Sequence, residues 1–242
     1  MEEHKKRRMI KMYLRAPNVA VPASIAGVGV VLLILGMLEI GGLATLSGVV
    51  LFVALYGAGG ATESQVDTWF AEDLAKLQRA ALDRIGLDED DLEGDPVMVV
   101  GPILWKRPGI DDDELVWKRG RDKIARFSIY RVIIVFLTEH FMNCYSCDFN
   151  FLRNVALNEH DSQYHYKDVV SVSKGEIAQS CTLSTGEDLN SSEGFCLSFT
   201  NGDKISVTVS AEKLKDITKA DFPTNAVEKA VRTIRTMLKA KI

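Results

Sequence analysis

The feature that most constrains the fold is an apolar run at residues 18–60. These 43 residues contain a single charged side chain, Glu39, in a chain of which 26% is charged. A membrane-spanning helix needs about 20 apolar residues, and the run offers that length twice, as residues 19–38 and 40–58. We therefore expect a two-helix transmembrane hairpin that reverses near residues 39–42, where glycines suit a tight turn.

The segment before the run is a basic arm, residues 1–17. Its net charge is +4, because six Lys and Arg outweigh two Glu, and the rest of the chain is then −8. Positive residues flank the cytoplasmic ends of spans, so we expect both termini in the cytoplasm and a two-pass protein of the inner (plasma) membrane. A signal peptide and a buried helical hairpin are the alternatives, and the length and apolarity of the run argue against both.

Small residues recur within the run at helical spacing. Ala23 is four residues before Gly27, and Ala44 is four residues before Gly48. Such pairs lie on one helix face and let helices approach closely. We expect these faces to pack within the hairpin or between copies of the chain. Neither segment carries a central acid, His or Arg, which argues against a transporter or proton relay.

Residues 61–94 are expected to form a juxtamembrane helix and an acidic linker. The apolar positions of the helix step by three or four residues and make one stripe, at Val66, Phe70, Leu74, Leu77, Ala81 and Ile85. The stripe has two readings: it packs on the following domain, or it packs on copies of itself in a homo-oligomer. The acidic linker lacks the spacing of a calcium-binding EF-hand loop.

Residues 95–242 change to a pattern of short β-strands that ends in one helix. The clearest element is a hairpin at residues 195–210, where Asn201-Gly202 favours a type I′ turn between alternating arms. The last segment, PTNAVEKAVRTIRTMLKAKI, has one apolar and one basic face, with Thr224 or Asn225 as its cap. The predicted fold class is α+β, with a β-rich domain of about seven strands.

This order of elements resembles the pleckstrin-homology-like (PH-like) superfold of bacterial membrane-anchored proteins. The resemblance rests on YRVIIVFLTEHF at residues 130–141, YHYKDVVSVS at 164–173, the NGD hairpin and the final helix. It implies an antiparallel β-barrel or sandwich capped by the C-terminal amphipathic helix. It also implies binding or scaffolding without catalysis.

Some PH-like domains bind phosphoinositide head groups through basic residues between their first two strands. The corresponding segment here, residues 106–123, has an acidic centre, which departs from a phosphate-binding loop. The bases that follow are candidate contacts to anionic lipid: Lys118, Arg119, Arg121, Lys123 and Arg126. The alternative is a solvated turn of mixed charge.

Cysteine and histidine offer little chemistry. Cys144 and Cys147 form a C-x-x-C motif, but in strand-like sequence, where residues three apart point to opposite faces. A zinc site would also need Cys181 and Cys196, but these two do not form a second C-x-x-C motif. His160 and His165 lack the spacing of the zinc ligands in a zinc hydrolase. We expect no cofactor, no metal site and no enzymatic activity.

The sequence thus predicts a membrane-anchored cytoplasmic scaffold that self-assembles and recruits a protein partner at the inner membrane, in contact with membrane lipids. The alternative is a homo-oligomeric membrane effector, pore-forming or bilayer-disrupting, of the kind found in bacterial immune systems and gated by the cytoplasmic domain. The acidic balance outside the basic arm makes nucleic acid a poor partner.

Overall fold

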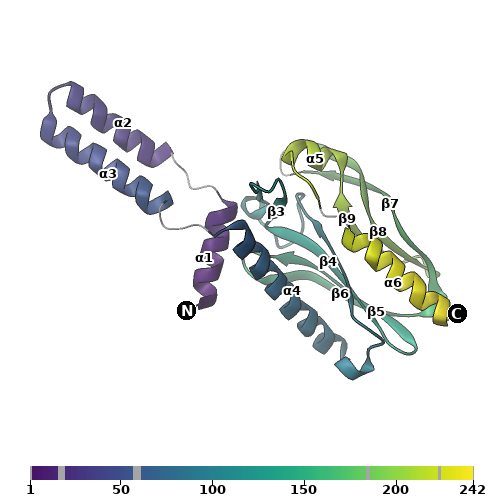
Figure 1. The fold of residues 1–242 in the computed structure, drawn as a ribbon. Helices are drawn as coiled ribbons and strands as arrows, with labels where there is room; N and C mark the ends of the chain where they lie inside the picture. The colour runs from purple at the N-terminus through teal and green to yellow at the C-terminus, as the bar shows by residue number, and fades with distance from the viewer. Residues whose placement is uncertain (1, 16–19, 57–60, 184–185, 223–224, 242) are drawn as a thin grey trace. The chain divides into compact units, whose positions relative to one another are not determined.

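The fold comes from a computed structural model that describes residues 2–15, 20–56, 61–183, 186–222 and 225–241. The chain divides into two compact units, Met1–Val66 and Asp67–Ile242. Both are drawn in Figure 1. The protein belongs to the α+β class, with helices in both units and antiparallel sheets in the second.

The first unit contains helix α1 (Glu2–Leu14) and a helical hairpin of α2 (Ala20–Ile34) and α3 (Leu38–Tyr56). The hairpin was expected to reverse at residues 39–42, and this was wrong. The reversal comes earlier, around Gly36, which has the left-handed φ of +81° that glycine tolerates. Glu39 consequently lies in the first turn of α3, where its carboxylate faces the positive end of the helix dipole.

Within the described residues, no helix is both long enough and apolar enough to cross a membrane. The early reversal ends α2 at Ile34, so that 15 of its residues are described, whereas a span needs about 20. The outer ends of the two predicted spans, Val19 and Ala58, lie outside the described residues. The predicted transmembrane hairpin and the two-pass inner-membrane location inferred from it are therefore wrong.

The two hairpin helices pack on each other through small residues. A Cβ placed on Gly48 would lie 2.6 Å from the backbone nitrogen of Ala26, and one placed on Gly29 would lie 2.4 Å from that of Thr45. Gly27 has no such neighbour within 4 Å. Of the two expected kinds of packing, within the hairpin or between copies, the structure shows the first. It uses Gly48 and not Gly27.

The second unit contains two antiparallel sheets. The first has the order β1-β4-β5-β6 and the second the order β7-β8-β9. Their strands are β1 (Val97–Pro102), β4 (Ile129–Leu137), β5 (Phe141–Asn150), β6 (Val155–His165), β7 (Val169–Thr182), β8 (Asp188–Phe199) and β9 (Lys204–Ser210). A small hairpin, β2 (Trp117–Arg119) with β3 (Ala125–Phe127), is inserted between β1 and β4.

The main core lies between the inner faces of the two sheets and is closed by α6 (Asn225–Lys241). Val227, Ala230 and Ile234 of α6 are buried in it, as the periodicity of this segment predicted. Helix α6 begins at Asn225, and Thr224 lies outside the described residues. Which of these two predicted residues caps the helix therefore stays a prediction. A short helix, α5 (Glu212–Thr218), follows β9 and packs on a second core cluster.

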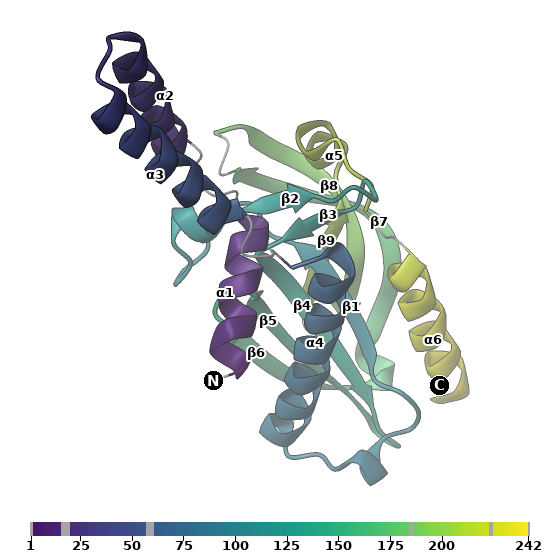
Figure 2. The same cartoon turned by 60° about the vertical axis from the view of Figure 1, so that its left-hand side comes forward.

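Helix α4 (Glu63–Ile85) lies along the outer face of the first sheet (Figure 2). The ring of Phe70 contacts those of Tyr130 and Phe151, with centroids 4.4 and 5.1 Å apart. At the other end of the helix, Arg84 pairs with Glu159 and Asp161 of β6. Phe70, a residue of the predicted apolar stripe, therefore packs on the following domain. This was one of the two predicted roles of the stripe.

Candidate functional site

A polar cluster interrupts the apolar interior between the two sheets. Arg131 and Asp148 are direct cross-strand partners on β4 and β5. Side chains alternate along a strand, so Arg131 shares its face with Ile133 and Val135, which belong to the core. A charged pair at this position costs desolvation energy unless its hydrogen bonds are satisfied, and such pairs are common at functional sites.

Asp148 is the centre of the cluster and its side chain is 0% exposed. Oδ1 accepts a hydrogen bond from Nη1 of Arg131 at 3.0 Å. Oδ2 accepts from Nε of Arg107 at 2.9 Å and from Nδ2 of Asn158 at 2.8 Å. Nη2 of Arg131 donates to Oγ of Ser146 at 3.1 Å. One buried carboxylate therefore holds two guanidinium groups at fixed positions.

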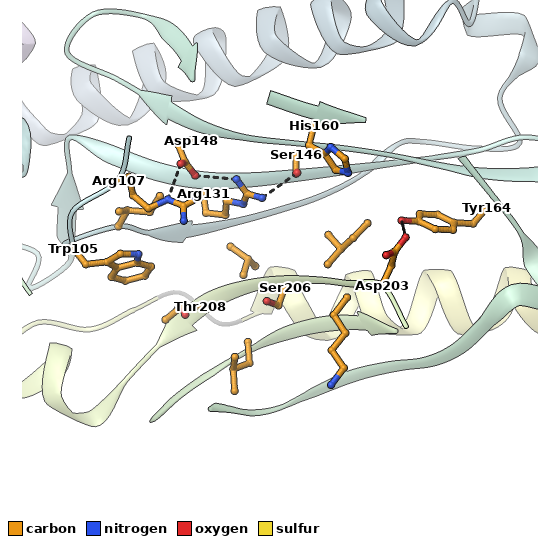
Figure 3. Close-up of a pocket in the computed structure, with 15 residues that line it drawn as sticks. Trp105, Arg107, Arg131, Ser146, Asp148, His160, Tyr164, Asp203, Ser206 and Thr208 are labelled. Atoms are coloured by element: carbon orange, nitrogen blue, oxygen red, sulfur yellow. Dashed lines mark hydrogen bonds and ion pairs between the residues drawn. The ribbon is translucent and has the colours of Figure 1, made fainter. Parts of the chain in front are cut away.

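These residues form one wall of a cavity of about 380 Å³, shown in Figure 3. Strand β9 forms the opposite wall, where Ser206 and Thr208 alternate with the core residues Val207 and Val209. Trp105 lies at one end of the cavity, as Figure 3 shows. The volume falls within the usual range for small-ligand sites, about 300 to 1,000 Å³. We call this cavity the inter-sheet cleft.

The other end of the inter-sheet cleft is closed by a second carboxylate. Oδ2 of Asp203 accepts hydrogen bonds from the Tyr164 hydroxyl at 3.1 Å and from Nδ2 of Asn201 at 2.7 Å. Tyr164 stacks on Phe199, and burial raises the pKa of its hydroxyl. The hydroxyl therefore stays protonated and acts here as a hydrogen-bond donor.

Histidine adds no catalytic arrangement to the inter-sheet cleft. His160 lines it, and its Nε2 lies 3.1 Å from Oγ of Ser162 on an exposed part of β6. A nucleophilic serine needs a histidine oriented by a third group, and among the hydrogen bonds of the described residues none joins His160 to a carboxylate. His165 packs its ring against Phe141 instead.

The two cysteines of the C-x-x-C motif lie on opposite faces of β5. Cys144 belongs to the core between the sheets, and Cys147 is paired with Val132. Burial raises the pKa of each thiol to about 12, so both are protonated and poor nucleophiles near neutral pH. Across the described residues, no group of three or more His, Cys, Asp or Glu could hold a metal ion.

The predicted lipid-contact residues divide into two groups. Lys118, Arg119, Arg121 and Lys123 are exposed on the β2–β3 hairpin, and lipid contact through them stays a prediction. Arg126 does not belong with them, because its side chain is only 5% exposed and pairs with Asp67 and Asp122. This arginine fastens α4 to the hairpin and is not available to an anionic lipid.

The predicted oligomer-interface residues are placed in three environments. Val66, Leu77 and Ala81 of the α4 stripe are buried, and Phe70, Leu74 and Ile85 are partly buried. These six residues therefore do not present an open apolar stripe. In the hairpin, Gly48 is used for internal packing, whereas Ala23 and Gly27 are exposed and Ala44 is partly exposed.

The sequence alone did not single out the residues of the inter-sheet cleft. The sequence does mark two of these residues. Arg131 is the one charged residue in the strand IYRVIIVFL, and Asp148 is the one charged residue in the strand FMNCYSCDFN. A charge inside a nearly continuous apolar strand indicates a buried partner. Which partner it has depends on strand register, and the contribution of Arg107 depends on a loop.

Comparison with known proteins assigns no family to this arrangement. The chain matches no protein-family model, no curated protein and no solved structure.

Proposed function

We propose that residues 95–242 are a PH-like binding module and that the protein is a scaffold without catalytic activity, which recruits a partner through the inter-sheet cleft. The order of elements supports the PH-like part of this proposal. A meander of four strands is followed by a meander of three strands and a C-terminal helix that closes the core.

The observation that carries the binding role is the buried cluster around Asp148. Folding places two arginines and a carboxylate inside a sheet interior, where apolar residues would stabilise the domain at least as well. A polar cleft of this kind is suited to holding a ligand group by several hydrogen bonds at once. The side chains around it offer donors and acceptors but no activated nucleophile.

A photo-crosslinking experiment tests the binding role for a partner of any identity. The photoreactive residue p-benzoylphenylalanine is placed at Ser206, an exposed residue that lines the inter-sheet cleft, or at Lys118, on the β2–β3 hairpin, in the full chain in its native host. We expect a discrete adduct from position 206 that is lost when Arg107→Gln is added. The same adducts from both positions would contradict a partner site in the cleft.

A second candidate function, self-assembly, is favoured by the surface of the α2–α3 hairpin. Most of the large apolar side chains that are exposed in the described residues lie there, among them Ile34, Leu43, Leu46 and Val50. Contiguous apolar surface of this kind marks an interaction site. We propose that the hairpins of several copies cover one another and bring their binding modules together.

A further inference from the structure

We propose that the inter-sheet cleft recognises a carboxylate group, carried by an extended acidic segment of a partner protein, with Arg107 and Arg131 as the residues that bind it. This inference rests on the proposed binding function and adds the chemistry of the ligand. Neither arginine belongs to the basic hairpin, and the site lies between the sheets.

The first argument is the balance of hydrogen-bond donors and acceptors. Both carboxylates of the inter-sheet cleft already accept from protein groups, Asp148 from three donors and Asp203 from two. The guanidinium group of Arg107, in contrast, still has donors that make no hydrogen bond within the described residues. Arg107 is bonded only through Nε among the described residues, although a guanidinium also carries donors on both terminal nitrogens. The spare donors of Arg107 therefore favour a ligand that accepts hydrogen bonds.

The second argument is accessibility. Arg107 and Arg131 are 35% and 23% exposed, whereas the carboxylate that holds them is completely buried. Asp148 thus fixes both guanidinium groups, as the close-up in Figure 3 shows. The terminal nitrogens of Arg107 remain available to a ligand. Preorganised guanidinium groups bind planar carboxylates through paired, charge-assisted hydrogen bonds.

The third argument concerns the charge of the ligand. The bases Arg107, Arg131 and Lys204 that line the inter-sheet cleft exceed its acids, Asp148 and Asp203, by one positive charge. One carboxylate balances that charge. A phosphate group carries about −1.5 to −2 at neutral pH, and it would leave an excess of negative charge beside Asp148 and Asp203.

The fourth argument is the shape of the cavity and the apolar side chains in it. The inter-sheet cleft follows β9 over the consecutive residues 203–208, and β9 pairs with β8 alone in its sheet. Ile103, Ile177 and Ile205 add apolar surface beside the charged groups. An extended peptide in which acidic and apolar side chains alternate matches this wall, since alternate residues of a strand point to opposite sides.

The test measures the anisotropy of short peptides that carry a neutral fluorophore, in the presence of the full chain. The first probe is acetyl-Val-Glu-Val-Glu-Val-amide, and its matched control has Gln in place of both Glu. A third peptide has phosphoserine in place of both Glu, and unlabelled inorganic phosphate serves as a competitor. We expect saturable binding of the Glu peptide, with affinity for the Gln peptide weaker by about tenfold or more.

Two substitutions assign this binding to the inter-sheet cleft. Arg107→Gln removes a partly exposed donor, and Ser206→Glu places a competing carboxylate on exposed β9 surface. We expect each to weaken the Glu peptide by about tenfold or more, while Lys118→Gln on the β2–β3 hairpin changes nothing. Circular dichroism verifies that all three variants are folded.

The outcomes separate this inference from the binding function itself. Equal affinity for the Glu and Gln peptides, or tighter binding of phosphoserine or phosphate, would overturn carboxylate recognition. If those ligands still depend on Arg107, the cleft remains a binding site of different chemistry. If no probe binds, carboxylate recognition is overturned, and the crosslink from position 206 decides separately whether the binding function stands.

Discussion

Arg131 and Asp148 face each other across β4 and β5 with 3.0 Å between Nη1 and Oδ1, inside an otherwise apolar sheet interior. Asp148 also receives Arg107 and Asn158, so a single carboxylate organises the inter-sheet cleft. A buried charge that loses its partner is costly. The relationship therefore makes a prediction about stability as well as about binding.

Asp148→Asn should strongly destabilise the second unit. The substitution keeps the shape of the side chain but leaves two guanidinium groups without their shared counter-charge, at a cost of about 3 kcal/mol in the free energy of unfolding. Urea unfolding followed by tryptophan fluorescence measures this, since Trp69, Trp105 and Trp117 all belong to that unit. As the control, Asp203→Asn at an exposed residue should cost less than about 1 kcal/mol.

Gly101→Ala should disrupt the place where β1 and β9 cross. A Cβ at this position would lie 1.8 Å from the backbone oxygen of Thr208, and neither strand can move away without losing core contacts. We expect a loss of about 3 kcal/mol in the free energy of unfolding. Gly175→Ala in β7 is the matched control, because nothing lies within 4 Å of its Cβ position; a similar loss there would contradict the explanation.

The ion pair between Arg126 and Asp122 should make the stability of the fold depend on pH in the acid range. The hydrogen bonds of Arg126 lower the pKa of Asp122 from 3.8 to about 2, so the stabilising contribution is present above pH 4 and disappears as the pH falls towards 2. Arg126→Gln should lower the urea midpoint at pH 7 and flatten its decline between pH 4 and 2. An unchanged slope in the variant would show that other carboxylates cause the decline.

The four cysteines should react with a thiol reagent in two classes. Cys144 and Cys147 are buried with pKa values of about 12, whereas Cys181 and Cys196 are partly exposed. At pH 8, a thiol of pKa about 12 has roughly one thousandth of the thiolate of an ordinary cysteine. Titration with Ellman's reagent should therefore show two reactive thiols in the native protein and four in guanidinium chloride. Four rapid reactions in the native state would contradict the burial of the motif.

Self-assembly through the α2–α3 hairpin predicts a change in mass. Light scattering of the full chain should give a multiple of 26.8 kDa, and Leu43→Glu with Leu46→Glu should reduce it to one chain, because the charges repel and resist burial. The control places the same charges on the β2–β3 hairpin, with Lys118→Glu and Arg119→Glu. A monomeric parent chain, or an assembly that survives both hairpin substitutions, would contradict this role.

Local patterns in the sequence predicted much of the second unit. A hairpin turn is present at Asn201-Gly202, but the predicted type I′ geometry is wrong, because only Gly202 has a positive φ, +89°, and type I′ needs one at both residues. The apolar face of α6 is buried as its periodicity predicted. These features depend on neighbouring residues alone. The nine strands among the described residues exceed the expected number of about seven.

Features that depend on distant residues were harder to predict. Arg126 was grouped with four exposed bases, yet its partner Asp67 is 59 residues away in α4. The inter-sheet cleft likewise depends on the register between β4 and β5 and on Arg107 from a loop. In the hairpin, the position of the reversal decided where α2 ends and α3 begins, and a pair of glycines indicated the wrong place for it.

The most direct test of the central claim uses Trp105 as a reporter inside the inter-sheet cleft. Trp69→Phe and Trp117→Phe leave it as the sole tryptophan of the chain, and the unlabelled Glu peptide is titrated into this variant. We predict a saturable change in emission that vanishes with Arg107→Gln. Binding of the peptide by anisotropy with no change in Trp105 emission would place the ligand elsewhere and contradict the account.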